Sequence, residues 1–155
     1  MFRRLIETWR TWATLPLRLT LGLIFIAHGA QKVFGAWGGP GLQRFAGGSP
    51  PFGWMKPAWL WMGAAALAEL LGGALVLLGL LTRVGALLII PVMLTAMLGV
   101  HWAGGFFSTN APLPGIEYTV ALTGAALALL IMGGGRASFD ETLSGPRARR
   151  GYKTK

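Results

Sequence analysis

The chain has 155 residues, of which 54% are hydrophobic and 12% are charged, and it contains 24 glycines and no cysteine. A soluble domain carries roughly 25% charged residues, so this composition predicts a membrane protein and argues against a soluble enzyme. The lack of cysteine excludes disulfides, thiolate nucleophiles, iron–sulfur clusters and cysteine-ligated zinc from this chain. The formal net charge is +9, and the basic residues gather near the two ends.

Four apolar segments predict membrane-spanning helices, because a span needs about 20 mostly apolar residues. Arg18 and Lys32 interrupt the first segment, and we expect their aliphatic stems to run along the helix toward opposite interfaces. Pro91 predicts a kink in the third segment. The expected fold is all-α, a polytopic membrane protein built as a four-transmembrane-helix bundle. Its predicted spans are residues 15–35, 57–81, 84–103 and 117–135.

The distribution of Lys and Arg predicts the orientation of these spans. Most basic residues precede the first span, follow the fourth, or lie between the second and third, which places them on the cytoplasmic side. We therefore expect a multi-pass protein of the bacterial cytoplasmic (inner) membrane with both termini cytoplasmic. Residues 1–14 are predicted to form a retained interfacial segment, 15–143 the membrane domain, and 144–155 a basic tail that faces anionic lipid and not nucleic acid.

Polar residues inside the predicted spans are candidate site residues, because an ionisable group in the bilayer costs several kcal/mol. Spacings of three and four place three of them on one face of the first helix. Glu69 is predicted to lie roughly 18 Å below the outer end of the second helix, near the midplane. If these faces point inward, the polar residues form a column that lines one pocket open to the outside. The candidates are His28, Gln31, Lys32, Glu69, His101 and Glu117.

Structural roles for the same residues fit the sequence too. Glu69 could pair with Lys32 or His28 only to fix the helix register, while Lys32 and Glu117 could anchor the helices at the interface. Small residues around Glu69, including Gly72 and Gly73, are expected to let a neighbouring helix approach closely.

A quinone matches this set of side chains best among small ligands. It needs an apolar slot, a hydrogen-bond donor such as His28 or Lys32, and a residue such as Glu69 to exchange protons. The two histidines lie at different heights, so we expect no haem, and the spacings predict neither a metal site nor a nucleotide site. No covalently bound cofactor is expected. Phe106 and Phe107 of the second outer loop are expected to shield the pocket entrance.

Six motifs occur in an order that resembles the DoxX family of small four-helix membrane proteins, over about residues 15–143. They are HGAQK, ELLGG, GLLTR, GGFF, GIE and GGGRASFD. The family is similar to the DoxD component of thiosulfate:quinone oxidoreductase. The resemblance implies that His28, Gln31, Lys32, Glu69, His101 and Glu117 belong to a quinone or substrate pocket. Within that pocket we expect Glu69 to be the catalytic residue that exchanges protons.

The expected function is that of a DoxX-like integral membrane subunit of a quinone-linked oxidoreductase, which binds quinone or anchors a redox partner. Since the chain has no cysteine and no cofactor motif, the electron donor is expected on a partner membrane or periplasmic subunit. Two other functions fit the same residues. One is a small-molecule permease or export component, for which four helices would have to assemble as a homo-oligomer. The other is a non-catalytic assembly or stress-related membrane subunit.

Overall fold

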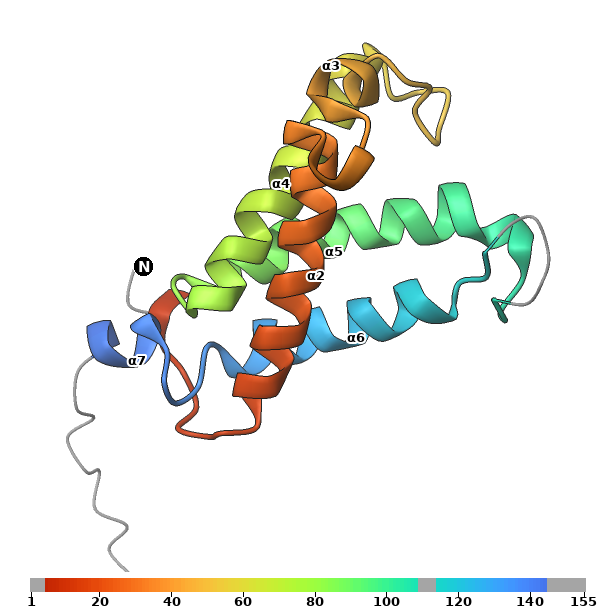
Figure 1. Cartoon of the computed structure of the whole chain (residues 1–155). Coiled ribbons are helices and arrows are strands. Elements are labelled where there is room, and N and C mark those ends of the chain that lie inside the picture. The colour runs from red at the N-terminus through yellow and green to blue at the C-terminus, as the bar shows by residue number, and fades with distance from the viewer. Residues whose placement is uncertain (1–4, 109–113, 145–155) are drawn as a thin grey trace, which may run out of the picture.

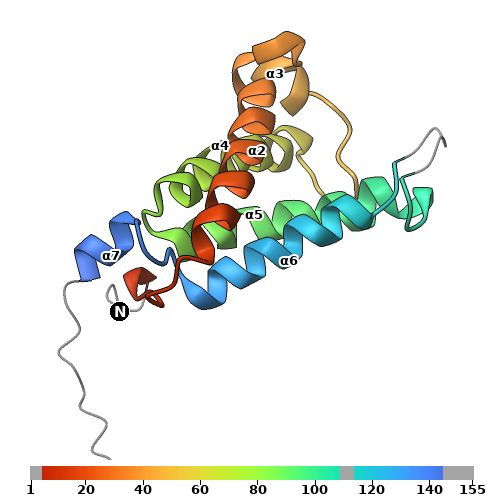
Figure 2. The same cartoon turned by 60° about the horizontal axis from the view of Figure 1, so that its bottom comes forward.

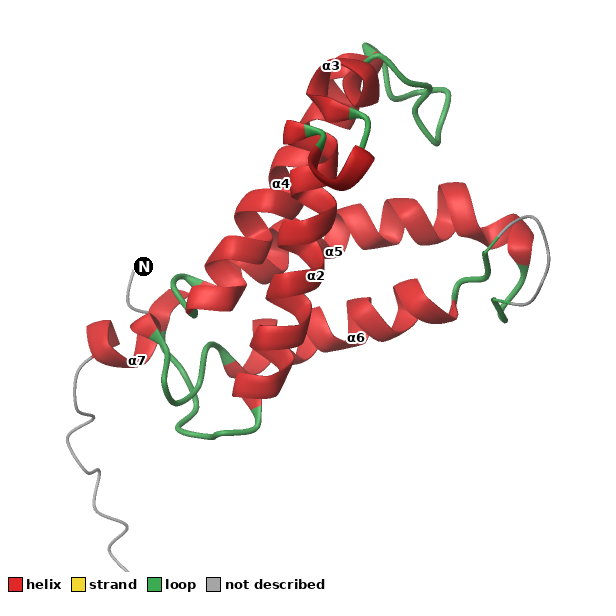
Figure 3. Ribbon diagram, in the orientation of Figure 1, coloured by secondary structure: helices red, strands yellow, loops and turns green. Residues whose placement is uncertain are grey.

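The computed structural model describes residues 5–108 and 114–144, and every regular element in these ranges is a helix (Figure 3). The four long helices lie within three residues of the predicted apolar segments, with the third continued by short turns. The all-α prediction is confirmed for the described ranges. The long helices are α2 (Thr14–Phe34), α4 (Ala58–Leu78), α5 (Thr82–Ala96) and α6 (Glu117–Met132); the shorter elements are α3 (Gly41–Ala46), α7 (Phe139–Ser144), η1 (Ala36–Gly38), η2 (Met97–His101) and η3 (Trp102–Gly104).

The long helices pack in chain order and spread apart toward one end. α2 lies on α4, α4 on α5, and α5 on α6. The pairs α2/α4 and α5/α6 meet near α7 and diverge toward the end that carries α3 (Figures 1 and 2). The four long helices expected to form a bundle are therefore arranged as two pairs that splay apart toward one end.

Glycines determine where the helices touch. A Cβ atom at Gly29 of α2 would lie 2.5 Å from the backbone nitrogen of Leu70 in α4, so the two backbones are in direct contact. Gly72 of α4 faces Gly85 of α5, and a Cβ at Gly72 would lie 3.0 Å from the Gly85 carbonyl oxygen. A Cβ atom at Gly73 would lie 2.9 Å from the Phe25 Cβ atom of α2. The predicted close approach at Gly72 and Gly73 is confirmed, and it is typical of helix packing in membranes.

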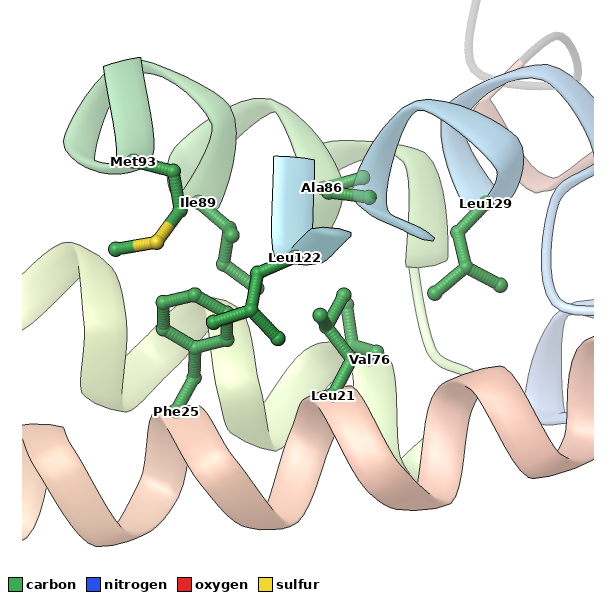
Figure 4. Packing of buried hydrophobic residues seen from close by; sticks show 9 residues of the cluster. Leu21, Phe25, Val76, Ala86, Ile89, Met93, Leu122 and Leu129 are labelled. Carbon is green, nitrogen blue, oxygen red and sulfur yellow. The ribbon is translucent and has the colours of Figure 1, made fainter. Parts of the chain in front are cut away.

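An apolar cluster fills the region where the two pairs meet (Figure 4). Phe25 and Leu21 of α2 are each 1% exposed and point at side chains from α4, α5 and α6. Burial of such side chains contributes about 1.5–3 kcal/mol each, as an upper estimate in a lipid environment. The cluster consists of Leu21, Phe25, Val76, Ala86, Ile89, Met93, Leu122, Ala126 and Leu129.

Arg18 is buried at the α7 end, which corrects the expectation that its side chain reaches toward the membrane interface. Only 2% of the residue is exposed. Its guanidinium donates hydrogen bonds to the carbonyl oxygens of Val76 and Leu77 at the end of α4 and to those of Gly134 and Ala137 after α6, at 3.0–3.2 Å. The last carbonyls of a helix have no intrahelical partner, so Arg18 satisfies carbonyls at the end of α4 and joins that end to the segment after α6.

Asp140 of α7 has the complementary role at the start of α5. Its carboxylate accepts hydrogen bonds from the backbone N–H groups of Leu81 at 2.7 Å and Thr82 at 2.9 Å. α7 is held in place by its own cap, in which the Glu141 N–H donates to the Ser138 hydroxyl oxygen at 3.1 Å. Arg18 and Asp140 together fasten α4, α5, α6 and α7 at one end of the molecule, because charged groups near helix termini stabilise them.

Two helical stretches among the described residues are long and apolar enough to cross a membrane, namely Ala58–Leu78 and Thr82–Gly104. A third span results if Thr14–Phe34 and Ala36–Ala46, which meet at a bend of 93°, are counted together. α6 is apolar but has 16 residues, fewer than the about 20 that a full span needs. Length and composition thus support two or three membrane spans among the described residues.

Candidate functional site

A cavity of about 710 Å³ lies between α4 and α5, on the side where the two helical pairs diverge. The helices touch at Gly72 and Gly85 and then separate, which opens the space between them. The volume falls within the range of about 300–1,000 Å³ that is usual for small-molecule sites. Most of the lining is apolar; the polar lining residues are Lys32, Glu69, Thr95 and His101.

An ion pair between α2 and α4 forms the polar wall of this cavity. Lys32 Nζ lies 2.5 Å from each carboxylate oxygen of Glu69. Glu69 is 2% exposed, whereas the Lys32 side chain is 22% exposed and faces the cavity. A charge buried without a partner would be costly, so the charge of each residue offsets the cost of burying the other.

The register of α2 explains why Lys32 points inward. Arg18, Phe25 and Lys32 are spaced by seven residues, about two helical turns, and therefore follow one face of the helix. That face is buried against α4 at Arg18 and Phe25. Lys32 continues it to the point where the cavity begins.

Lys32 retains hydrogen-bonding capacity beyond the ion pair. An ammonium group has three N–H donors, and two of them serve the carboxylate oxygens of Glu69. Lys32 Nζ also lies 5.2 Å from the ring centroid of Phe45 in α3, a cation–π distance. The ammonium group therefore has one more N–H donor than the two carboxylate oxygens use, and Lys32 lines the cavity.

His101 contributes a further polar group to the lining of the cavity. It ends the π-helical turn η2, which also brings Val100 to the lining. Such turns are frequent at functional sites. The His101 Nδ1 atom lies 3.3 Å from the Pro114 carbonyl oxygen, and the tautomer that donates this bond keeps Nε2 as an acceptor.

The cavity is covered by α3 and the loop that follows it, not by the loop predicted from the sequence. Pro51 packs against Gly99, where an added Cβ would lie 2.5 Å from the Pro51 Cβ, so the loop connects the two diverging pairs. Trp54 contacts Trp61 edge to face, with ring centroids 5.4 Å apart. Both tryptophans line the cavity, as do Phe45, Pro51 and Met55.

Phe106 and Phe107 do not shield the entrance, contrary to expectation. Their rings contact each other at a centroid distance of 5.1 Å, they are 53% and 66% exposed, and neither lines the cavity. The covering residues of the first outer loop were missed because turn-rich segments have no periodicity, and because tryptophans at a membrane surface are equally typical of interfacial anchors. The sequence signal that could have identified this cover is the concentration of aromatic residues in the 20-residue stretch 37–56.

The structure brings together Lys32, Glu69 and His101 from the predicted column and places the other candidates elsewhere. His28 is exposed on α2 and Gln31 is half-buried outside the lining. Glu117 accepts a hydrogen bond of 2.8 Å from the Ser108 N–H, which ties the second outer loop to the start of α6. A shared spacing of three and four was insufficient because His28 lies on the exposed side of α2, whereas Lys32 faces Glu69 of α4.

Comparison with known proteins identifies one family. The sequence model of the DoxX family matches residues 13–102. This range contains every residue that lines the cavity, from Lys32 to His101. No match was found among the curated proteins or among the solved structures.

Proposed function

We propose, from the premise that this membrane protein belongs to the DoxX family, that it is a membrane subunit that binds a quinone for a quinone-linked oxidoreductase. The observation that carries the proposal is the Lys32–Glu69 ion pair at the wall of a large apolar cavity. An ion pair that served only to fix the helix register would not need an adjoining cavity.

The chemistry of the cavity suits a quinone head group. A quinone is a flat apolar ring with two carbonyl acceptors, and it requires an apolar slot with few, well-placed donors. Lys32 offers one N–H toward the cavity, and aromatic side chains such as Phe45 and Trp61 offer flat surfaces. His101 also lines the cavity, and its ring is suited to contact the second carbonyl group of the quinone.

The roles of the residues follow from the balance of the reaction. Reduction of a quinone to a quinol consumes two electrons and two protons. In this proposal, a reduced flavin or haem on a partner subunit supplies the electrons. Lys32 binds and orients a carbonyl oxygen through its free N–H, and Glu69, hydrogen-bonded to Lys32, exchanges protons with the site.

The proposal includes the topology expected from charge. The chain crosses the bacterial inner membrane four times, with α6 as the fourth span and both termini in the cytoplasm. The basic residues before α2 and after α6 support this orientation, because positive charge is retained on the cytoplasmic side. α3 and the cover of the cavity then face the periplasm.

Quinone binding is tested with the purified protein in lipid nanodiscs and decylubiquinone as the probe. We expect quenching of tryptophan fluorescence to report binding, since Trp54 and Trp61 line the cavity. Lys32→Gln and Glu69→Gln should each weaken binding by about tenfold or more, as expected for loss of a charged hydrogen-bonding group. His28→Ala is the matched control, because His28 is exposed and outside the lining, and it should bind as the wild type does.

Two results would refute the proposal. One is a wild-type protein that does not bind the quinone. The other is wild-type affinity in both ion-pair variants. Native mass spectrometry of the protein extracted with its partners tests the redox assignment separately: a stoichiometric flavin or haem subunit is expected, and a homo-oligomer without bound quinone would favour transport instead.

A further inference from the structure

We infer that the cavity opens sideways into the bilayer, so that its ligand is an amphiphile whose polar head meets Lys32 and Glu69 while its apolar chain leaves between α4 and α5. This inference rests on the proposed function and specifies its substrate class. It predicts a long-chain membrane quinone in place of a water-soluble quinone.

The polar and exposed parts of the lining lie on different sides of the cavity. Glu69 is 2% exposed and forms the wall next to α2. Ala64 of α4 and Leu87 and Pro91 of α5 also line the cavity, yet they are exposed on the surface. The cavity therefore reaches the surface of the protein along the edge between these two helices.

Apart from Thr95, the lining residues along this edge are apolar. On α4 it includes three alanines, Ala64, Ala65 and Ala68, beside the larger Trp61 and Met62. On α5 it runs from Leu87 to Ala96, which corresponds to about 14 Å of helix. α4 and the continued α5 are the two stretches with the length and composition of membrane spans, so the edge between them faces lipid.

The end of the cavity near α3 is covered, in contrast to its side. Met55 is 6% exposed, and Phe45 lies over Lys32 with its ring centroid 5.2 Å from Nζ. The contact of Pro51 with Gly99 joins this cover to the far helical pair. At the α4/α5 edge, Ala64 and Leu87 line the cavity and are both exposed.

The apolar edge and the ion pair line the same cavity, so one ligand can contact both. A small head group contacting Lys32 would leave the region from Leu87 to Pro91 unfilled. A chain attached to that head group fills it and remains in an apolar environment along its whole length. The edge is therefore assigned to the chain of the same molecule.

The test compares two quinones with the same ring, decylubiquinone and its chain-free counterpart, bound to the protein in nanodiscs. Affinities are expressed relative to the mole fraction of each quinone in the lipid, so that simple partitioning cancels. The wild type should bind the decyl compound about tenfold more tightly, because the chain gains packing contacts with the helix edge beyond those it has in lipid. Ala64→Phe should abolish this gain by filling the edge, so that the two quinones bind with similar affinity.

Ala121→Phe provides the matched control, because Ala121 is exposed on α6 and does not line the cavity. It should retain the tenfold gain. Leu87→Phe repeats the test from the α5 edge, where the 51% exposed side chain has room to grow without disturbing the fold. Circular dichroism establishes that each variant is helical.

The outcomes separate the inference from the proposed function. Equal affinity of the wild type for both quinones would overturn the lateral edge and leave quinone binding in place. Retention of the gain in both edge variants, or equal weakening of both quinones, would also overturn it. If neither quinone binds to the wild type, the proposed function itself fails.

Discussion

Breaking the Lys32–Glu69 ion pair should destabilise the protein far more than breaking an exposed ion pair. At the observed separation of 2.5 Å, two unit charges attract by about 7 kcal/mol for an effective dielectric constant of about 20. Desolvation offsets most of this attraction, but removal of one partner leaves the other buried and unpaired. We therefore expect Glu69→Ala and Lys32→Ala each to lower the free energy of unfolding by about 3–5 kcal/mol.

The double variant Lys32→Met/Glu69→Leu gives the sharper result. Because it removes both charges and keeps similar volume, its free energy of unfolding should lie within about 1 kcal/mol of the wild-type value. The assay is reversible unfolding in mixed micelles by titration with a denaturing detergent, followed by circular dichroism. The control is Arg10→Gln, which breaks the 3.8 Å contact with Glu141, in which the Arg10 side chain is 52% exposed, and should cost less than about 1 kcal/mol.

Two findings would refute this reasoning. If each single ion-pair variant costs no more than Arg10→Gln, water screens the pair and the site is not buried. If the double variant costs as much as the two single variants together, Lys32 and Glu69 do not compensate each other.

Three further predictions concern the framework that holds the cavity open. Arg18→Lys should lower the free energy of unfolding by about 2–4 kcal/mol, because an ammonium group cannot reach the carbonyls of two helix ends at once, and hydrogen exchange should increase at the ends of α4 and α6. Asp140→Ala should cost about 1–3 kcal/mol through loss of the two backbone bonds at the start of α5, measured by the same unfolding titration. Gly29→Val should prevent α2 from packing on α4 and abolish folded protein in size-exclusion chromatography, whereas Gly63→Ala, with no atom within 4 Å of the added Cβ, should be tolerated.

The positions of the helices were predictable because hydrophobicity alone determines them. The apolar stretches begin and end at charged or turn-forming residues, and Gly35 and Gly79 end α2 and α4 in left-handed conformation with φ of 71° and 65°. These are local signals that the sequence carries near each helix end. An ion pair between Lys32 and Glu69 was one of the pairings expected from the sequence, because few other charges are available inside the apolar segments.

The parts that sequence reasoning missed depend on contacts between distant residues. Arg18 looked like an interfacial residue because its partners, such as Val76 and Gly134, are backbone carbonyls that no side-chain pattern reveals. His28 looked equivalent to Lys32 because residues four apart lie on nearly the same helix face. Their directions nevertheless differ by about 40° around the helix axis. Which of the two turns inward depends on where α4 lies against α2.

The apolar cluster between Glu69 and Arg18 gives any redox reaction in the cavity a defined sidedness. Leu21, Phe25 and Val76 separate the ion pair from the charged residues at the α7 end, and the cluster contains no titratable group. In the proposed reaction, protons consumed at Glu69 would therefore come from the compartment next to α3. Electrons delivered from that same compartment would make turnover electroneutral, whereas electrons delivered from the α7 side would move charge across the membrane. The location of the electron donor would thus decide whether turnover contributes to the membrane potential.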